Sequence, residues 1–196
     1  MARSRRPQDH FGRRARREGF PARSVYKLQE LDRRLGLLRR GARVLDLGAA
    51  PGSWTLWAAE RVGEQGRVIA VDLQAIDVAL PRQVRTHQAD IFTLSAADLG
   101  GPSSFDVVLS DMAPATTGQR HLDQYRSFEL FTHALSLARA VLAPGGSFVG
   151  KIFQGPDSGE AQRAVAAAFE KARLLKPDAS RAESYEVFLA GLRLRG

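Results

Sequence analysis

Two lysines and two carboxylates of this chain occur where the surrounding residues are apolar. Lys151 alternates with Val149 and Phe153 in a predicted strand, and Glu186 occurs in a second apolar run. Alternate residues of a strand share one face, so Lys151 is predicted to point into a core, where an unpaired ammonium would be costly. It needs a carboxylate, and Asp111, at the end of the neighbouring predicted strand, is the natural partner. For Glu186, an exposed position at a sheet edge is the alternative.

The second lysine, Lys27, lies in a predicted helix over residues 24–35. It stands at the edge of an apolar stripe formed by Val25, Leu28, Leu31 and Leu35. A lysine at such an edge can simply extend its ammonium to solvent. However, the chain contains 25 Arg and only 4 Lys. Arginine cannot be deprotonated in a protein whereas lysine can act as a base, so the lysines that remain indicate a chemical role.

A ligand-binding turn is predicted in residues 43–57, RVLDLGAAPGSWTLW. The pattern is a buried strand, a turn containing Gly48 and Gly52, and a helix that Ser53 can cap. In an α/β sheet of this kind, a ligand lies beyond the carboxyl ends of the strands. The turn lacks the G-x-G-x-x-G pattern of dinucleotide sites, and Asp46 suits an ammonium group better than a pyrophosphate. These features indicate S-adenosylmethionine, with an ordinary turn without ligand as the alternative.

More carboxylates follow the next predicted strands. Asp72 ends a second apolar run and can accept both ribose hydroxyls of a nucleotide. Asp90 follows a third predicted strand, where it could hold the adenine amino group or lie in a surface turn. Asp111 directly follows the apolar run FDVVLS and is predicted at the same sheet edge as Asp72.

Methyl transfer from a sulfonium to a ribose hydroxyl explains the four charged residues Lys27, Asp111, Lys151 and Glu186. The reaction is an in-line displacement that requires alignment of donor and acceptor and removal or stabilisation of the hydroxyl proton. Lys151 can serve as the base. If it stays charged, it would instead stabilise the developing alkoxide.

Alternating strands and helices must position these residues. The strands are predicted at 44–47, 67–71, 83–87, 105–110, 147–153 and 185–189, and the helices at 24–35, from residue 53 onward, at 124–142 and at 159–172. With 196 residues, 44% of them hydrophobic, we predict a single α/β domain.

Composition excludes several classes of protein and site. The chain has no Cys, so disulfides, a cysteine nucleophile and thiolate metal sites are excluded. The four His residues show no ligand spacing, and we expect no metal. There is no apolar run of membrane-spanning length and no secretory signal. We therefore expect a cytoplasmic monomer without membrane association.

Positive charge is concentrated at the start of the chain. Residues 1–40 carry 13 Lys/Arg and 4 Asp/Glu, whereas residues 41–196 carry 16 and 17. Within residues 1–23 the aromatic residues Phe11 and Phe20 interrupt a series of arginines: Arg3, Arg5, Arg6, Arg13, Arg14, Arg16 and Arg17. We predict that residues 1–23 form an RNA-binding arm without an amphipathic helix, preceding a methyltransferase domain over residues 24–196. A solubilising tail is the alternative.

The chain resembles the FtsJ-type ribosomal RNA large subunit 2′-O-methyltransferases, also called RrmJ or RlmE, from about residue 9 to residue 191. The resemblance is carried in order by DHFGRRARREGFPARSVYKLQEL, VLDLGAAPGSW, VVLSDMAP, LAPGGSFVGKIFQG and KPDASRAESYEVFLAG. It implies a Rossmann-like S-adenosylmethionine-dependent fold with a mostly parallel seven-stranded sheet flanked by helices. It also implies that the target is a uridine of 23S ribosomal RNA, in the assembled large ribosomal subunit.

The resemblance assigns roles to individual residues. The catalytic tetrad of the family falls on Lys27, Asp111, Lys151 and Glu186, with Lys151 as proton acceptor. The donor-binding positions fall on Gly52, Trp54, Asp72, Asp90 and Asp111. Two positions depart from the family pattern, because Ser53 replaces a usual glycine and Ala115 replaces a usual asparagine.

Other functions remain as alternatives. A 2′-O-methyltransferase acting on tRNA or an mRNA cap would share the tetrad, and a non-catalytic RNA-binding assembly factor would share the basic arm. A nicotinamide-dependent oxidoreductase would share the sheet but lacks its fingerprint. A base N-methyltransferase would usually carry Pro-Pro and an aromatic residue where this chain reads Asp111-Met112-Ala113-Pro114.

Overall fold

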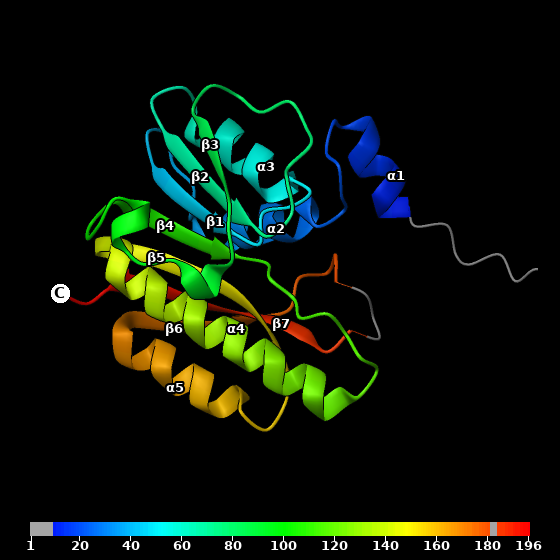
Figure 1. The fold of residues 1–196 in the computed structure, drawn as a ribbon, viewed down its shortest axis with the longest axis vertical. Helices are drawn as coiled ribbons and strands as arrows, with labels where there is room; N and C mark the ends of the chain where they lie inside the picture. Colours follow the sequence, from blue (N-terminus) through cyan, green and yellow to red (C-terminus); the bar gives the residue numbers. More distant parts are fainter. Residues whose placement is uncertain (1–9, 181–183) are drawn as a thin grey trace, which may run out of the picture.

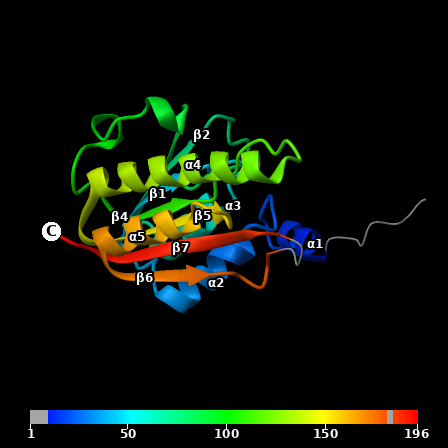
Figure 2. The same cartoon turned by 90° about the horizontal axis from the view of Figure 1, so that it is seen from below.

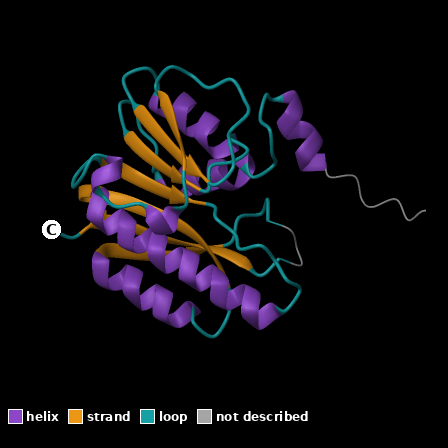
Figure 3. Ribbon diagram, in the orientation of Figure 1, coloured by secondary structure: helices purple, strands orange, loops and turns teal. Residues whose placement is uncertain are grey.

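A seven-stranded sheet forms the centre of the computed structural model, which describes residues 10–180 and 184–196 (Figures 1 and 3). The strands are β1 (Arg43–Leu47), β2 (Arg67–Asp72), β3 (Val84–Gln88), β4 (Phe105–Ser110), β5 (Leu142–Phe153), β6 (Phe169–Leu175) and β7 (Glu186–Leu194). Their order is β3-β2-β1-β4-β5-β7-β6. Strands β1 to β5 pair in parallel, and β7 pairs antiparallel with both β5 and β6. The predicted mostly parallel seven-stranded α/β fold is therefore confirmed.

Helices cover both faces of this sheet. They are α1 (His10–Arg17), α2 (Val25–Leu35), α3 (Ser53–Val62), α4 (Arg120–Val141) and α5 (Ser158–Ala168). Figure 2 shows α4 on one side of the sheet and α2 on the other. Two short 3₁₀ helices, η1 (Ile91–Thr93) and η2 (Ala97–Leu99), lie between β3 and β4. Within the described ranges, no helix has the length and apolar composition to cross a bilayer.

The central strands divide their side chains between two cores. In β4, Val108 packs in the core under α4 and α5, whereas Val107 and Leu109 pack in the core under α2 and α3. This alternation is what the period of two in the sequence predicts. Asp111 comes two residues after Leu109, and Lys151 comes two residues after Val149, which packs in the same core. Both are therefore expected on the side of the sheet that α2 covers.

Two segments differ from the sequence-based prediction. The helix predicted over 159–172 ends at Ala168, and the chain continues as β6, which pairs with β7. The basic arm was predicted without an amphipathic helix, yet residues 10–17 form α1, whose Ala15 is fully buried. In both cases contacts with another element stabilise a structure that the local pattern does not predict. The arm residues Arg3, Arg5 and Arg6 lie outside the described residues.

Candidate active site

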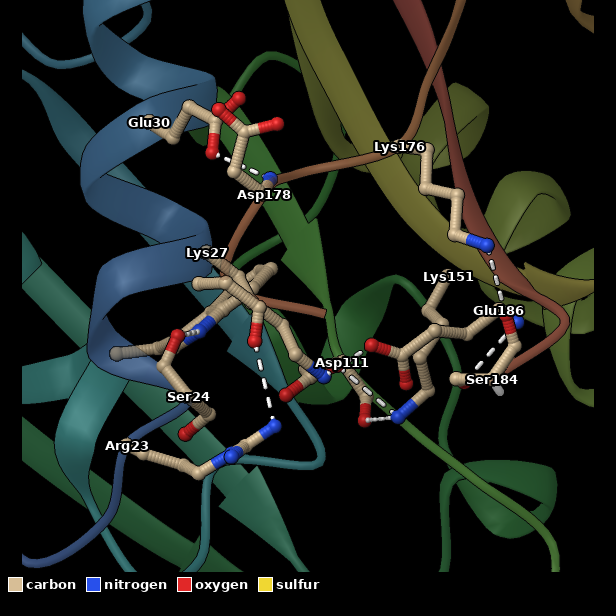
Figure 4. Close-up of polar contacts among 12 residues, drawn as sticks. Arg23, Ser24, Lys27, Glu30, Asp111, Lys151, Lys176, Asp178, Ser184 and Glu186 are labelled. Carbon is tan, nitrogen blue, oxygen red and sulfur yellow. Dashed lines mark hydrogen bonds and ion pairs between the residues drawn. The ribbon is translucent and has the colours of Figure 1, made fainter. Parts of the chain in front are cut away.

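The sheet register brings the tetrad residues together. Ser110 of β4 pairs with Gly150 of β5, so Asp111 and Lys151 each follow one residue later at the same edge. In the antiparallel pair, Lys151 lies opposite Phe188, which places Glu186 two residues away along β7. Figure 4 shows the side chains of these residues and of Lys27, from α2, meeting in one region.

The four side chains form two ion pairs. Lys27 Nζ lies 2.5 Å from Glu186 Oε1, and Lys151 Nζ lies 3.0 Å from Asp111 Oδ1. Lys151 also donates a hydrogen bond of 2.6 Å to the backbone carbonyl of Asp111. The Lys151 side chain is only 7% exposed, so it is held in one direction rather than free in solvent. The predicted partnership of Lys151 with Asp111 is thus confirmed, whereas the pairing of Lys27 with Glu186 was not predicted.

Glu186 remains a carboxylate in this setting. Burial alone would raise its pKa, but the attraction and hydrogen bonding of Lys27, together with the charge of Lys151, outweigh burial and lower the pKa. Its backbone N–H is bonded to Ser184 Oγ at 3.2 Å, which fixes the start of β7. The alternative of an exposed Glu186 at a sheet edge is wrong, because Glu186 is buried and β7 lies inside the sheet.

A cavity of about 420 Å³ opens beyond the carboxyl ends of β1, β2 and β4. Four of the predicted donor-binding residues line it: Gly48, Asp72, Asp90 and Asp111. The Asp72 carboxylate accepts hydrogen bonds from the backbone N–H groups of Ala50 at 2.9 Å and Gln74 at 2.8 Å. A carboxylate held from two sides in this way can present its remaining lone pairs to a sugar hydroxyl.

Gly48 is required by the shape of this cavity. Its φ of +76° favours glycine, and a Cβ there would lie 2.5 Å from Met112 Cγ. Met112 itself lines the cavity, as do the exposed Leu73 and Phe92. These three apolar side chains were not predicted. For Leu73 and Met112 the available signal was their position directly after a predicted acid, and Phe92 follows Asp90 by two residues.

Three other predicted donor-binding residues lie behind the described lining. Asp46 is fully buried and accepts a 2.7 Å hydrogen bond from Thr55 Oγ1. Trp54 donates from Nε1 to the Ser24 carbonyl at 2.8 Å and stacks on Phe188. Gly52, at φ +107°, allows the close approach of the segment that follows β2. Their contacts hold the turn after β1 against α2, α3 and the segment after β2.

Burial changes the ionisation of Asp46. It raises the pKa to about 7, and the charges of Asp111 and Asp72 act in the same direction, while the Thr55 hydrogen bond opposes them. Its Oδ1 is buried without a hydrogen-bond partner among the described residues. Asp46 is therefore a buried carboxyl group with one oxygen unpaired, and it does not line the cavity.

A second cavity, of about 430 Å³, lies on the other side of the Lys27–Glu186 pair. Lys27 and Glu186 line it together with Arg16 and Arg23. The two cavities thus differ in charge, since three carboxylates line the first, whereas three cations and Glu186 line the second. In the part of the chain that the structure describes, no cluster of three or more His, Cys, Asp or Glu residues could hold a metal ion.

Ser53 differs from its predicted role. Gly52 occupies the cap position of α3, and Ser53 makes no capping bond. Instead, the Ser53 hydroxyl accepts a 2.8 Å hydrogen bond from the Ala22 N–H and donates one of 3.1 Å to the Ala22 carbonyl. The turn after β1 is thereby joined to the segment that leads into α2.

Comparisons with known proteins agree with this geometry. A family model described as FtsJ-like methyltransferase matches residues 20–194. A protein named ribosomal RNA large subunit methyltransferase E from Sorangium cellulosum is 51% identical over 185 residues, covering 94% of this chain and 87% of the relative. A protein of that name from Nitratidesulfovibrio vulgaris (strain DSM 19637 / Miyazaki F) is 52% identical over 192 residues, covering 96% of each.

A solved structure supports the fold independently. The protein, described as a ribosomal RNA methyltransferase from Plasmodium falciparum, matches with a TM-score of 0.74 and 23% identity. The match covers 89% of this chain and 98% of the other. At this identity the likeness concerns the fold alone.

Proposed function

The chain belongs to the FtsJ-like methyltransferase family, and we propose that it methylates a ribose 2′-hydroxyl of ribosomal RNA with S-adenosylmethionine as donor. The target we propose is a uridine of 23S ribosomal RNA within the assembled large subunit. The names of the relatives support ribosomal RNA as substrate. Our proposal that the methyl group goes to the 2′-oxygen is argued from the arrangement of the tetrad residues.

One observation carries the proposal: the two lysine–carboxylate pairs border two cavities that differ in charge. The donor-side cavity is lined by Asp72, Asp90 and Asp111, and the acceptor-side cavity by Arg16, Arg23, Lys27 and Glu186. A buried amine next to the acceptor side suits an alcohol nucleophile, whose proton must leave as the new bond forms. A base nitrogen with an available lone pair would need no such amine.

The donor-side cavity has the properties that S-adenosylmethionine requires. Asp72 would hold the ribose hydroxyls and Asp90 the adenine amino group, with Leu73, Phe92 and Met112 providing apolar contact. The volume of about 420 Å³ is in the range of small-molecule sites. When bound, the donor supplies an electrophilic methyl group on a positively charged sulfur.

The protein's own residues then control the hydroxyl proton. Lys151 takes this proton when its amine is neutral, and the ammonium that results donates to Asp111 Oδ1 and to the Asp111 backbone carbonyl. These two contacts also fix the direction of the buried side chain. Glu186 is ionised because its pKa is lowered, and it positions Lys27 at the acceptor side. The four groups together align the hydroxyl and exclude water from it.

The replacement of Lys151 by arginine tests this role. Arginine keeps the positive charge but cannot accept the proton, so Lys151→Arg should lower the single-turnover rate of methyl transfer by roughly 10²- to 10⁴-fold. Donor affinity, measured by titration calorimetry, should stay close to that of the unmodified protein. Lys171→Arg, on the exposed face of β6, serves as the matched control.

A Lys151→Arg variant that binds donor and retains most of its rate would contradict a base role for Lys151. Lys151→Met, which keeps the buried stem without the amine, provides a second variant if arginine disturbs folding. Circular dichroism and donor binding establish that each variant is folded.

A further inference from the structure

Helix α1 forms one wall of the acceptor-side cavity. Gly12 and Arg16 from this helix line the cavity opposite Lys27 and Glu186. Arg16 is exposed, and among the described residues no carboxylate forms an ion pair with it. Of the arginines on α1, Arg16 is therefore the one whose charge is available inside this cavity.

A separate set of contacts holds α1 in place. Glu18, just after the helix, accepts hydrogen bonds from Arg14 Nε at 2.7 Å and from the Tyr26 hydroxyl at 2.9 Å. The Arg14 guanidinium lies over the Tyr26 ring at 4.9 Å, and Phe11 contacts the same ring at 5.6 Å between centroids. Tyr26 belongs to α2, one residue before Lys27. The contacts that dock α1 are thus adjacent to the tetrad.

The docking contacts persist over the physiological pH range. Burial, with the hydrogen bond to Glu18, raises the pKa of Tyr26 to about 12, so its hydroxyl remains a donor. The hydrogen bonds from Arg14 and Tyr26 lower the pKa of Glu18, so it remains an acceptor. Glu18 is a carboxylate in a strongly basic segment, and its partners Arg14 and Tyr26 belong to α1 and α2.

The chemistry of the acceptor requires a cation near the tetrad. In RNA, the carbon that bears the 2′-hydroxyl is bonded to the carbon that bears the 3′-phosphodiester. A site that seats this hydroxyl against Lys151 must therefore accommodate a negative charge alongside it. Arginine binds such a phosphate with paired N–H donors.

We propose that α1 is a docked positioning element in which Arg16 binds the phosphodiester next to the methylated ribose and the Glu18–Tyr26 contact fixes where Arg16 lies. This inference rests on the proposed function and assigns a specific task to α1. Arg16 and Glu18 are positioning residues, since neither contacts the reacting atoms.

The position of α1 and its net charge make opposite predictions for one variant. Glu18→Ala makes the basic segment more positive, so simple charge attraction to RNA would become stronger. If Glu18 positions α1, the same variant should bind transcribed 23S ribosomal RNA about threefold or more weakly. Glu64→Ala is the matched control, because it removes the carboxylate of an exposed ion pair with Arg82, between α3 and β2.

Arg16→Gln supplies the second measurement. Loss of one phosphate contact should flatten the dependence of log affinity on log salt by roughly 0.7 to 0.9. Arg139→Gln, in the last turn of α4, should leave the slope unchanged. Titration with S-adenosylmethionine should give wild-type donor affinity for all four variants, which also shows that they are folded.

Weaker RNA binding by Glu18→Ala together with a flatter slope for Arg16→Gln would support the proposal. Tighter or unchanged binding by Glu18→Ala, or an unchanged slope for Arg16→Gln, would overturn it. Methylation of large ribosomal subunits and of the same RNA by the unmodified protein is measured in parallel. Absence of 2′-O-methylation on both would count against the proposed function, whereas the binding data report on α1 separately.

Discussion

The charged residues of the site are buried (Lys151 and Glu186) or partly buried (Lys27 and Asp111), and each is neutralised by a partner from a different element. Lys151 of β5 pairs with Asp111 after β4, and Lys27 of α2 pairs with Glu186 of β7. Such pairs cost desolvation energy, and they are therefore weak evidence for a role in stability alone. Their position between two cavities gives them a functional explanation.

Residue identity alone was informative for this site. Charges inside apolar, alternating runs, together with the scarcity of lysine, are enough to single out Lys27, Lys151 and Glu186 in the sequence. The partner of Lys27 could not be predicted, since it depends on how the segment between β6 and β7 returns to α2. That return is set by contacts such as the 2.8 Å hydrogen bond from the Asp178 N–H to Glu30 Oε2.

Asp46 leads to a prediction about pH. Its folded pKa of about 7 lies above the ordinary value of 3.8, so between these values the folded protein holds a proton that the unfolded chain has released. Stability from this group is therefore present at low pH and is lost as the pH rises toward 7. Asp46→Asn removes this titration. As the pH rises from 5 to 8, the free energy of unfolding of wild type should therefore fall by about 2 to 4 kcal/mol relative to that of the variant.

Chemical denaturation of both proteins at pH 5 and pH 8 measures this difference. The comparison cancels the other titrating groups, since both proteins share them. A constant difference between the two proteins at both pH values would show that Asp46 does not titrate in this range.

At the level of elements, the buried strands were predicted better than β6 and α1. The alternating or fully apolar runs of β1, β2, β4 and β5 fix their faces directly. For β6, with the sequence FEKARLL, the local pattern is ambiguous. Phe169 is buried close to Gly191 of β7, where a Cβ would lie 2.3 Å from the ring, and this distant pairing decides for a strand.

Helix α1 could not be predicted for a similar reason. It has eight residues, too few for a stable isolated helix. Its stability comes from Tyr26 and Glu18 and from the burial of Ala15 beside Val25. These contacts form only when the helix docks against α2, so the local sequence of α1 does not reveal them.

Ser53 links two elements, and its hydroxyl can be tested alone. Ser53→Ala removes both hydrogen bonds to Ala22 while leaving the α3 backbone unchanged. We expect a loss of about 1 to 2 kcal/mol in the free energy of unfolding, because the Ala22 N–H loses its partner. Hydrogen exchange at the Ala22 amide should become faster.

Ser136→Ala, at an exposed position on α4, is the control and should change stability by less than about 0.5 kcal/mol. If Ser53→Ala is as stable as this control and Ala22 exchange is unaltered, Ser53 does not join the turn to the segment before α2.

At the level of the whole molecule, charge divides the protein into the side that we propose for the donor and the side that we propose for the acceptor. The excess positive charge lies in residues 1–40, which supply α1 and α2 to the acceptor-side cavity. The carboxylates that follow β2 and β4 line the donor-side cavity. The tetrad joins the two: Asp111 lines the first cavity, and Lys27 and Glu186 line the second.

The central claim is that the tetrad residues catalyse transfer of a methyl group to a ribose oxygen. The most direct measurement is mass mapping of large ribosomal subunits and of free 23S ribosomal RNA after incubation with the protein and isotopically labelled S-adenosylmethionine. The account predicts one labelled methyl on the ribose of a uridine, with the subunit as the better substrate. A label on a base, or RNA without any label, would contradict it.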